Sequence, residues 1–232
     1  MDKMLGIIGA MDEEINGIKK LLSEKKTEKI GFLEYTLGIY NGQKCVVLEC
    51  GVGKVNAAIG VETMILKYLP DSIICIGIAG GLSSTVKYED IVIARDTVQY
   101  DVDLTSFGNE KGFVLGPNRV RFPCDVKLVD IFSEILKKEN KDYHIGTIAT
   151  GDQFIADKHK HDLIAQEFSA IACDMESGSI GQVCYLHQVP FVVIRSISDD
   201  ASNSEVFDYI KFKQSASQMS IKVIKNFLDR RE

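Results

Sequence analysis

The sequence predicts an α/β fold in three layers, in which helices cover both faces of a mixed and mostly parallel central sheet. Short apolar runs alternate with segments of helical periodicity along all 232 residues. No linker, internal repeat or low-complexity tract interrupts this alternation. Asn41-Gly42 marks one hairpin, which makes the predicted sheet mixed. We therefore expect residues 1–232 to form a single domain.

In the N-terminal part, strand-length apolar runs are separated by two amphipathic segments. Ile15, Ile18 and Leu21 share one face of the segment 13–23, which is typical of a helix. A second helical segment is closed by Pro70. The predicted elements are strand 3–9, helix 13–23, strands 32–40 and 43–50, helix 55–68, and strands 72–78 and 91–94.

In the C-terminal part, a polar excursion precedes a second alternation of helices and strands. The segment 97–123 is rich in Asp, Gly, Asn and Phe and has weak periodicity. We expect it to be a long surface excursion, and such loops are often functional. The elements predicted after it are helix 126–138, strand 144–149, helices 158–168 and 176–187, strand 191–197, and the amphipathic helix 209–228.

Composition excludes several classes of function. Hydrophobic residues make up 45% and charged residues 26%, as in ordinary globular proteins, and the net charge is −6 with no basic arm, so we expect no nucleic-acid partner. The longest apolar runs have strand length, and acids follow the first one directly, so we expect a cytoplasmic protein without membrane contact. The six cysteines lie mostly in apolar runs without a CxxC pair, which favours buried reduced thiols. No HExxH pattern occurs, so neither a metal nor another cofactor is expected.

Three predicted strands end in glycine-containing turns, which let a backbone approach a ligand closely. These turns begin at Gly9, at Gly51 and at Gly77. The second, GVGKVN, imitates a dinucleotide fingerprint, but Asn56 stands in place of the third glycine, and the segment also lacks the P-loop pattern. The repetition along the chain predicts a shared ligand cleft at one edge of the sheet.

Carboxylates follow three of the predicted strands. Glu14 follows the first strand, Asp174 and Glu176 precede a helix, and Asp199 closes a strand that also carries Arg195. Each acid alone is explained as a helix cap, a dipole partner or half of an ion pair. Together they favour a general acid and a general base on opposite sides of a sugar, the arrangement that cleaves glycosidic bonds.

Six segments carry a family resemblance, in this order: IIGAMDEEI, CGVGKVNAA, GIAGGL, ATGDQFI, CDMES and PFVVIRSISDD. The chain resembles the 5′-methylthioadenosine/S-adenosylhomocysteine nucleosidases of the purine nucleoside phosphorylase/hydrolase superfamily, from residue 5 to residues 207–208. The resemblance implies the superfamily's fold and hydrolysis of the N-glycosidic bond of both nucleosides, which releases adenine and the thioribose. It also implies the same cleavage of 5′-deoxyadenosine. Such an activity serves methionine salvage and methyl-cycle detoxification.

The resemblance also implies roles for individual residues. Glu14 matches the carboxylate that activates the attacking water, and Asp199 matches the acid that protonates adenine N7. Arg195 matches the arginine that supports both. Glu176 matches the carboxylate that binds the ribose hydroxyls. The other substrate-binding residues implied are Met175 against the sugar, Phe154 and Ile155 at adenine, Gly80, Ser198, and the apolar Met11, Val52 and Phe207.

The resemblance implies adenine nucleosides as small-molecule partners and a homodimer in which a neighbour completes each pocket. The excursion 97–123, with Phe107 and Phe113, fits that contact or a lid or plain surface loop equally well. The chain departs from the family at Ile78, where a small hydroxyl residue is usual, and the task of Asp174 stays open.

The sequence leaves three alternative functions open. A purine nucleoside phosphorylase would need fixed positive charge for phosphate, and the turn 77–81 carries none. An aminodeoxyfutalosine-type nucleosidase would differ only in the pocket for the 5′ substituent. A nucleoside-binding relative without activity would be expected to lack one of the acids, yet Glu14, Glu176 and Asp199 are all present.

Overall fold

The computed structural model describes residues 3–200 and 206–230, with the side chains of 199, 200 and 206–213 excepted. Its helices are α1 (Asp12–Leu21), α2 (Lys54–Tyr68), α3 (Val126–Lys138), α4 (Lys158–Phe168), α5 (Ser177–His187) and α6 (Val206–Leu228), with a 3₁₀ turn η1 (Thr105–Phe107). Its strands are β1 (Met4–Gly9), β2 (Ser23–Ile30), β3 (Leu33–Tyr40), β4 (Gln43–Glu49), β5 (Ser72–Gly81), β6 (Ile91–Gln99), β7 (Arg121–Pro123), β8 (Tyr143–Thr150), β9 (Ala170–Asp174) and β10 (Phe191–Asp200).

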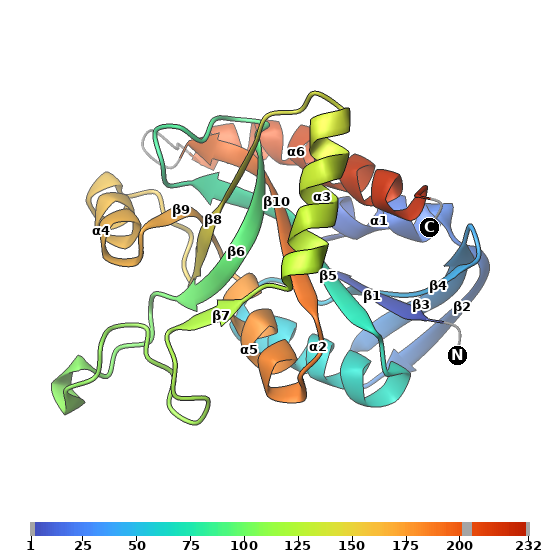
Figure 1. Cartoon of the computed structure of the whole chain (residues 1–232), viewed down its shortest axis with the longest axis horizontal. Coiled ribbons are helices and arrows are strands. Elements are labelled where there is room, and N and C mark those ends of the chain that lie inside the picture. The colour runs from blue at the N-terminus through green and yellow to red at the C-terminus, as the bar shows by residue number, and fades with distance from the viewer. Residues whose placement is uncertain (1–2, 201–205, 231–232) are drawn as a thin grey trace.

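The strands form one mixed sheet, which confirms the predicted fold class. From β2 the order runs β3, β4, β1, β5, β9, β8, β6 and β10, while β7 pairs only with β6. β1 is parallel to both β4 and β5, whereas β2, β3 and β4 form an antiparallel meander in which the predicted Asn41-Gly42 turn joins β3 to β4. The sheet is covered on one face by α1, α3 and α6 and on the other by α2 and α5 (Figure 1).

One part of the sheet closes on itself, which the sequence does not predict. β10 pairs in parallel with β5 and antiparallel with β6, while β5 also pairs with β9 through Gly80 and Gly81. The strands β5, β10, β6, β8 and β9 therefore form a ring. Because β9 and β10 both pair with β5 in this ring, the residues at the carboxyl ends of these three strands meet at one place.

The core explains why these segments become strands. β1, β5 and the described part of β10 are buried on both faces, as expected for near-continuous apolar runs. All six cysteines are buried, as their apolar flanks predict. Two helices are capped by aspartate side chains: Asp125 accepts a hydrogen bond from Leu128 N at the start of α3, and Asp157 accepts one from Lys160 N at the start of α4.

Three strands, β2, β9 and the short β7, were missed by the sequence prediction. The predicted helix 13–23 ends at Leu21, and its last residue already belongs to β2, whose side chains are mostly exposed. β9 is only five residues long and falls between two helical segments. The predicted excursion is also shorter at both ends, because β6 extends to Gln99 and β7 begins at Arg121. The remaining loop extends away from the body of the molecule at the lower left of Figure 1.

Of the helices that the structure describes, none combines the length and the apolar character needed to cross a membrane.

Candidate active site

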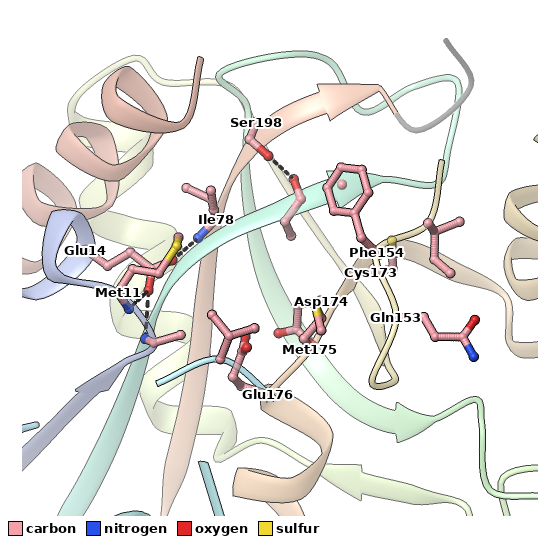
Figure 2. A pocket seen from close by; sticks show the side chains of 15 residues that line it. Met11, Glu14, Ile78, Gln153, Phe154, Cys173, Asp174, Met175, Glu176 and Ser198 are labelled. Atoms are coloured by element: carbon pink, nitrogen blue, oxygen red, sulfur yellow. Dashed lines mark hydrogen bonds between the residues drawn. The ribbon is translucent and has the colours of Figure 1, made fainter. Parts of the chain in front are cut away.

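A pocket opens at the carboxyl ends of β1, β5, β9 and β10, as the glycine turns predict (Figure 2). Loops after β4 and β8 complete it. Its walls are formed by Ala10, Met11, Glu14, Val52, Ile78, Ala79, Gly80, Gln153, Phe154, Ile155, Cys173, Asp174, Met175, Glu176 and Ser198.

Glu14 enters the pocket from the first turn of α1 and is almost fully buried. Its Oε2 accepts hydrogen bonds from the backbone of Ala10 (2.7 Å) and Met11 (3.0 Å), and its Oε1 accepts one from Ile78 N (3.0 Å). Burial nevertheless raises the pKa of Glu14, although Arg195 and the three N–H groups oppose this effect. The carboxylate is therefore fixed in orientation and more basic than an exposed glutamate.

Gly77 leaves the space that Glu14 occupies. The φ angle of Gly77 is +156°, and a Cβ atom built there would lie 2.5 Å from Oε1 of Glu14 and 3.0 Å from Nη1 of Arg195. A side chain at this position would push both groups away. Gly80, later in the same glycine turn, helps to close the ring of strands, because it pairs with Cys173 of β9.

Glu176 lies between β9 and α5, and its side chain reaches the beginning of α2. Its Oε1 accepts a hydrogen bond from Gly53 N at 3.0 Å, and its Oε2 lies 3.9 Å from Nη2 of Arg195. Burial, followed by the negative charge of Asp174, raises the pKa of Glu176 to about 7. Figure 2 shows Glu14 and Glu176 reaching the pocket from different elements.

Arg195 lies behind the pocket wall and forms a buried ion pair with Asp174. Its Nε and Nη2 lie 2.9 and 2.8 Å from Oδ2 of Asp174, and the two side chains are 2% and 1% exposed. Thr150 Oγ1 donates a 2.6 Å hydrogen bond to the other oxygen of Asp174. None of the described groups accepts a hydrogen bond from Nη1 of Arg195, which lies beside Gly77.

The opposite wall of the pocket is apolar and partly open to solvent. Phe154 and Ile155 follow β8, and Phe154 is 44% exposed whereas Ile155 is buried. Val52 lies in the loop between β4 and α2, at the mouth of the pocket, and is 46% exposed. Figure 2 shows Phe154 across the pocket from Glu14. This wall offers a flat ring and apolar contacts to a ligand, while the Glu14 wall offers charge.

The end of β10 carries the remaining site residues predicted from the sequence. Ser198 is buried, and its hydroxyl donates a 3.4 Å hydrogen bond to the carbonyl of Ala79. A bulge between Ile197 and Asp199 precedes the pairing of Asp199 with Gly80. The side chains of Asp199 and Phe207 lie outside the described residues, so only the backbone position of each is known.

The structure thus brings most of the predicted residues to one pocket. Glu14, Gly80, Met175, Glu176, Phe154, Ile155, Met11, Val52 and Ser198 line it, and Arg195 stands directly behind. Sequence reasoning missed the tight contact of Asp174 with Arg195 and the lining residue Gln153. In the sequence, Asp174 could have been noticed as a second acid two residues before Glu176, and Gln153 as a polar residue directly before Phe154. Within the described ranges, no group of three His, Cys, Asp or Glu side chains is placed to hold a metal ion.

A pocket with three buried carboxylates at the carboxyl ends of a mixed sheet is suited to general acid–base chemistry on a small molecule. The fold and the site define an α/β protein of the nucleoside phosphorylase and hydrolase class, and the model of the phosphorylase superfamily matches residues 4–229. Within this superfamily, the chain belongs to the family of 5′-methylthioadenosine/S-adenosylhomocysteine nucleosidases, which confirms the resemblance.

Curated relatives support this membership over almost the full length. The nucleosidase of Bacillus velezensis is 37% identical over 97% of this chain and 98% of its own. The nucleosidase of Haemophilus influenzae (strain PittEE) is 36% identical, with 97% and 99% covered.

Solved structures agree with the fold. The Helicobacter pylori nucleosidase, complexed with a pyrrolo-pyrimidine compound, has a TM-score of 0.94 at 30% identity, with 98% of both chains covered. The Streptococcus pyogenes S-adenosylhomocysteine nucleosidase, bound to 5-methylthiotubericidin, has a TM-score of 0.94 at 32% identity, with 98% of this chain and 97% of its own covered. A structure described as futalosine hydrolase, also from Helicobacter pylori, has a TM-score of 0.95 at 31% identity, with 99% and 98% covered.

Proposed function

We propose that this protein hydrolyses the N-glycosidic bond of 5′-methylthioadenosine and S-adenosylhomocysteine, and of 5′-deoxyadenosine, releasing adenine and the corresponding ribose. The observation that carries the proposal is the Glu14 carboxylate, buried and held by three backbone N–H groups at the wall of the pocket. The names of the relatives support the choice of substrates. The reaction would serve methionine salvage and the removal of S-adenosylhomocysteine.

Glu14 favours water over phosphate as the nucleophile. The N–H groups of Ala10, Met11 and Ile78, which could otherwise bind an anion, already donate to Glu14. Phosphate at this wall would meet a carboxylate instead of a cation, because the nearby Arg195 is paired with Asp174. A neutral water can donate a hydrogen bond to Glu14, so this arrangement supports hydrolysis rather than phosphorolysis.

Burial makes Glu14 a suitable general base. The raised pKa of Glu14 brings its basicity closer to neutral pH, where an ionised carboxylate can accept a proton from the attacking water. The three N–H donors hold the carboxylate in one orientation while the proton moves. General-base assistance of this kind contributes about 10²–10⁴-fold to the rate.

Glu176 and Met175 form the proposed ribose site. Ionised Glu176 would accept hydrogen bonds from two ribose hydroxyls, and its negative charge would stabilise the oxocarbenium-like sugar that forms as the bond breaks. Met175 lines the same pocket and offers an apolar contact to the sugar face. Glu14 and Glu176 together would place negative charge near the developing positive charge.

The leaving group is proposed to lie between Phe154, Ile155 and the end of β10. Phe154 offers its ring for stacking on adenine, and the Ile155 backbone would pair with the base edge. The assignment of Asp199 as the acid that protonates adenine N7 follows from the family resemblance and from its position next to Gly80, a residue of the pocket wall. Phe207, Met11 and Val52 are proposed to contact the 5′ substituent, with Gly80 and Ser198 completing the substrate site.

An aminodeoxyfutalosine-type nucleoside is the second candidate substrate. A solved structure described as futalosine hydrolase matches this chain as closely as those described as methylthioadenosine nucleosidases. The half-exposed Val52 and Phe154 leave the mouth open, so a substituent larger than a methylthio group has room to leave the pocket. Both substrates share the adenine and ribose contacts.

We further propose that residues 1–232 act as one nucleosidase domain, in the cytoplasm, as a homodimer. α2 and α5 pack on each other and expose large apolar side chains, and a partner on this face would also reach Val52 at the pocket mouth. The exposed apolar residues are Val55, Ile59 and Leu66 of α2 and Tyr185 and Leu186 of α5.

A product assay tests the proposed function. Purified protein is incubated with methylthioadenosine, S-adenosylhomocysteine or aminodeoxyfutalosine, with and without phosphate, and products are separated by chromatography. We expect adenine and free thioribose at a rate that phosphate does not change. A phosphate-dependent rate with a ribose-1-phosphate product would establish a phosphorylase, and release from aminodeoxyfutalosine alone would establish the second candidate. No release from any substrate would contradict an enzymatic function.

A further inference from the structure

Asp174 is the acid next to the proposed ribose site for which the reaction described above has no task. Its side chain is 1% exposed and receives two nitrogen atoms of Arg195 on a single oxygen, Oδ2. The other oxygen accepts the 2.6 Å hydrogen bond from Thr150 Oγ1, and Ser177 N lies 3.3 Å from both oxygens. Asp174 is therefore fixed by β8, by α5 and by β10 at the same time.

This arrangement fixes the guanidinium of Arg195 relative to two other carboxylates. Nη2 of Arg195 lies 3.9 Å from Oε2 of Glu176. On the other side, Nη1 and the Glu14 carboxylate both lie within 3.0 Å of the point where a Cβ of Gly77 would stand. The guanidinium thus stands between the proposed base and the proposed ribose ligand, and Asp174 is the carboxylate that contacts it directly.

We propose that Asp174 is a positioning residue that holds Arg195 in one orientation between Glu14 and Glu176 and sets the electrostatic balance at Glu176. This inference rests on the proposed function of Glu176 as the ribose ligand. While Asp174 holds the guanidinium, Arg195 stays 3.9 Å from Glu176 and neutralises the negative charge of Glu176 only in part. Without it, the guanidinium would be free to form a direct ion pair with Glu176 and to hold the side chain away from the ribose hydroxyls.

The charges around Glu176 support this view. Asp174 acts from β9 and raises the pKa of Glu176, whereas Arg195 acts from β10 and lowers it. Gly53 N at the start of α2 also lowers this pKa by hydrogen bonding. The titratable and charged groups that act on Glu176 are Asp174, Arg195, Glu14, Cys50 and Cys75.

A second buried aspartate in the fold provides a matched comparison. Asp96 in β6 pairs with Arg95 and Arg121 at 2.9 Å, and it accepts a 2.8 Å hydrogen bond from Thr147 Oγ1 of β8. Asp174 likewise binds an arginine and a threonine of β8, so removing either charge disturbs a similar network. Asp96 is not part of the pocket wall, so its loss reports the structural effect alone.

The first experiment measures the pKa of Glu176 without substrate. Protein labelled with ¹³C at the glutamate carboxyl carbons is titrated by NMR, and the Glu176 signal is assigned as the one missing in Glu176→Gln. We expect Asp174→Asn to lower the pKa of Glu176 by roughly one unit, because a like charge is removed and Arg195 is released towards Glu176. Asp174→Glu, which keeps the charge, and Asp96→Asn are expected to leave it unchanged.

The second experiment follows kcat and kcat/KM for adenine release against pH in the same proteins. Asp174→Asn is expected to lower kcat about tenfold at pH 8, through loss of the fixed geometry, and to move the acid limb of kcat/KM to lower pH. Asp174→Glu is expected to recover the position of that limb. If Asp174→Asn lowers kcat while the pKa of Glu176 and the acid limb stay in place, Asp174 is merely structural and the proposal is wrong.

A variant of Thr150 tests the positioning role without removing the charge of Asp174. Thr150→Val retains the charge of Asp174 but removes its hydroxyl donor, and we expect kcat to fall several-fold. An unchanged kcat in this variant would contradict the positioning role even if Asp174→Asn did not fold. If the wild-type protein releases no adenine but the NMR titration gives the expected shift, the proposed function fails and the electrostatic link between Asp174 and Glu176 stands.

Discussion

The carboxylate of Glu14 lies directly against the bare Cα of Gly77, on a strand more than sixty residues further along the chain. A Cβ atom at Gly77 would come within 2.5 Å of Oε1. The glycine therefore sets the position of the acid, and the backbone N–H of Ile78 next to it holds that acid in place at 3.0 Å.

Gly77→Ala should consequently remove activity without touching a reacting group. The added methyl group displaces Glu14 and Arg195, and a misplacement of about 1 Å can cost about 10²-fold in rate. We expect kcat for adenine release to fall by that amount in a steady-state assay.

Gly31→Ala is the matched control for Gly77→Ala. Gly31 also has a positive φ, +60°, but no atom lies within 4 Å of its added Cβ. Gly31→Ala should lose roughly 1–2 kcal/mol of unfolding free energy from its left-handed backbone. Gly77→Ala should lose at least as much, because its Cβ also overlaps Glu14 and Arg195, and only Gly77→Ala should lose activity. Equal kcat values in the two variants would show that Gly77 does not position Glu14.

Glu14→Gln tests the proposed general base. The amide keeps the size of the side chain but cannot accept a proton from water, so kcat should fall about 10²–10⁴-fold while KM changes little. Asp12→Asn removes an exposed acid from the same helical turn and should leave kcat within twofold. A Glu14→Gln protein that retains most of its kcat would exclude the base assignment.

The raised pKa of Glu176 makes a prediction about stability. Its pKa of about 7 in the folded state lies above the ordinary value of 4.5. Between these two pH values the folded state retains a proton that the unfolded state has released. Glu176 therefore lowers the unfolding free energy progressively from about pH 4.5 to about pH 7, by at most roughly 3 kcal/mol.

Urea unfolding of the wild type and of Glu176→Gln at pH 5 and pH 8 measures this effect. The variant should gain stability relative to the wild type as the pH rises, because it lacks the buried charge. The kcat/KM of the wild type should also fall below about pH 7, since protonated Glu176 is a poorer acceptor for ribose hydroxyls. A stability difference that does not depend on pH would mean that Glu176 has an ordinary pKa in the folded protein.

Ile59→Glu tests the proposed homodimer. Ile59 lies on α2 and is 43% exposed, and a charge buried in an interface is costly. We expect sedimentation equilibrium to give a dimer mass for the wild type and at least about a tenfold weaker association for this variant. Leu163→Glu, at a similarly exposed position on α4, should remain dimeric. A monomeric wild type would exclude the dimer.

The sequence was informative wherever burial imposed a pattern. β1, β5 and β10 could be predicted because both faces of these strands are covered, which selects continuous apolar runs. Glu14 and Glu176, which both line the pocket, could be singled out from the sequence because charges at the ends of buried strands are costly unless they are used or paired.

The sequence was silent where structure depends on contacts between distant segments. The closure of the ring requires β10 to pair with both β5 and β6, and no local pattern records two partners for one strand. The ion pair of Asp174 with Arg195 joins residues from two strands, and at the level of sequence Asp174 was one more acid before a helix. The distance between them became visible only in the folded chain.

β2 was missed because it lacks the alternation that identifies strands. It forms the outer edge of the sheet, and its sequence SEKKTEKI carries lysine and glutamate at mostly exposed positions. Glu28 forms ion pairs there with Lys26 and Lys67. A foreign strand that added to this edge would have to strip water from these charges, which disfavours aggregation by strand addition. β2, the segment whose sequence looks least like a strand, therefore protects the edge of the sheet from pairing with strands of other molecules.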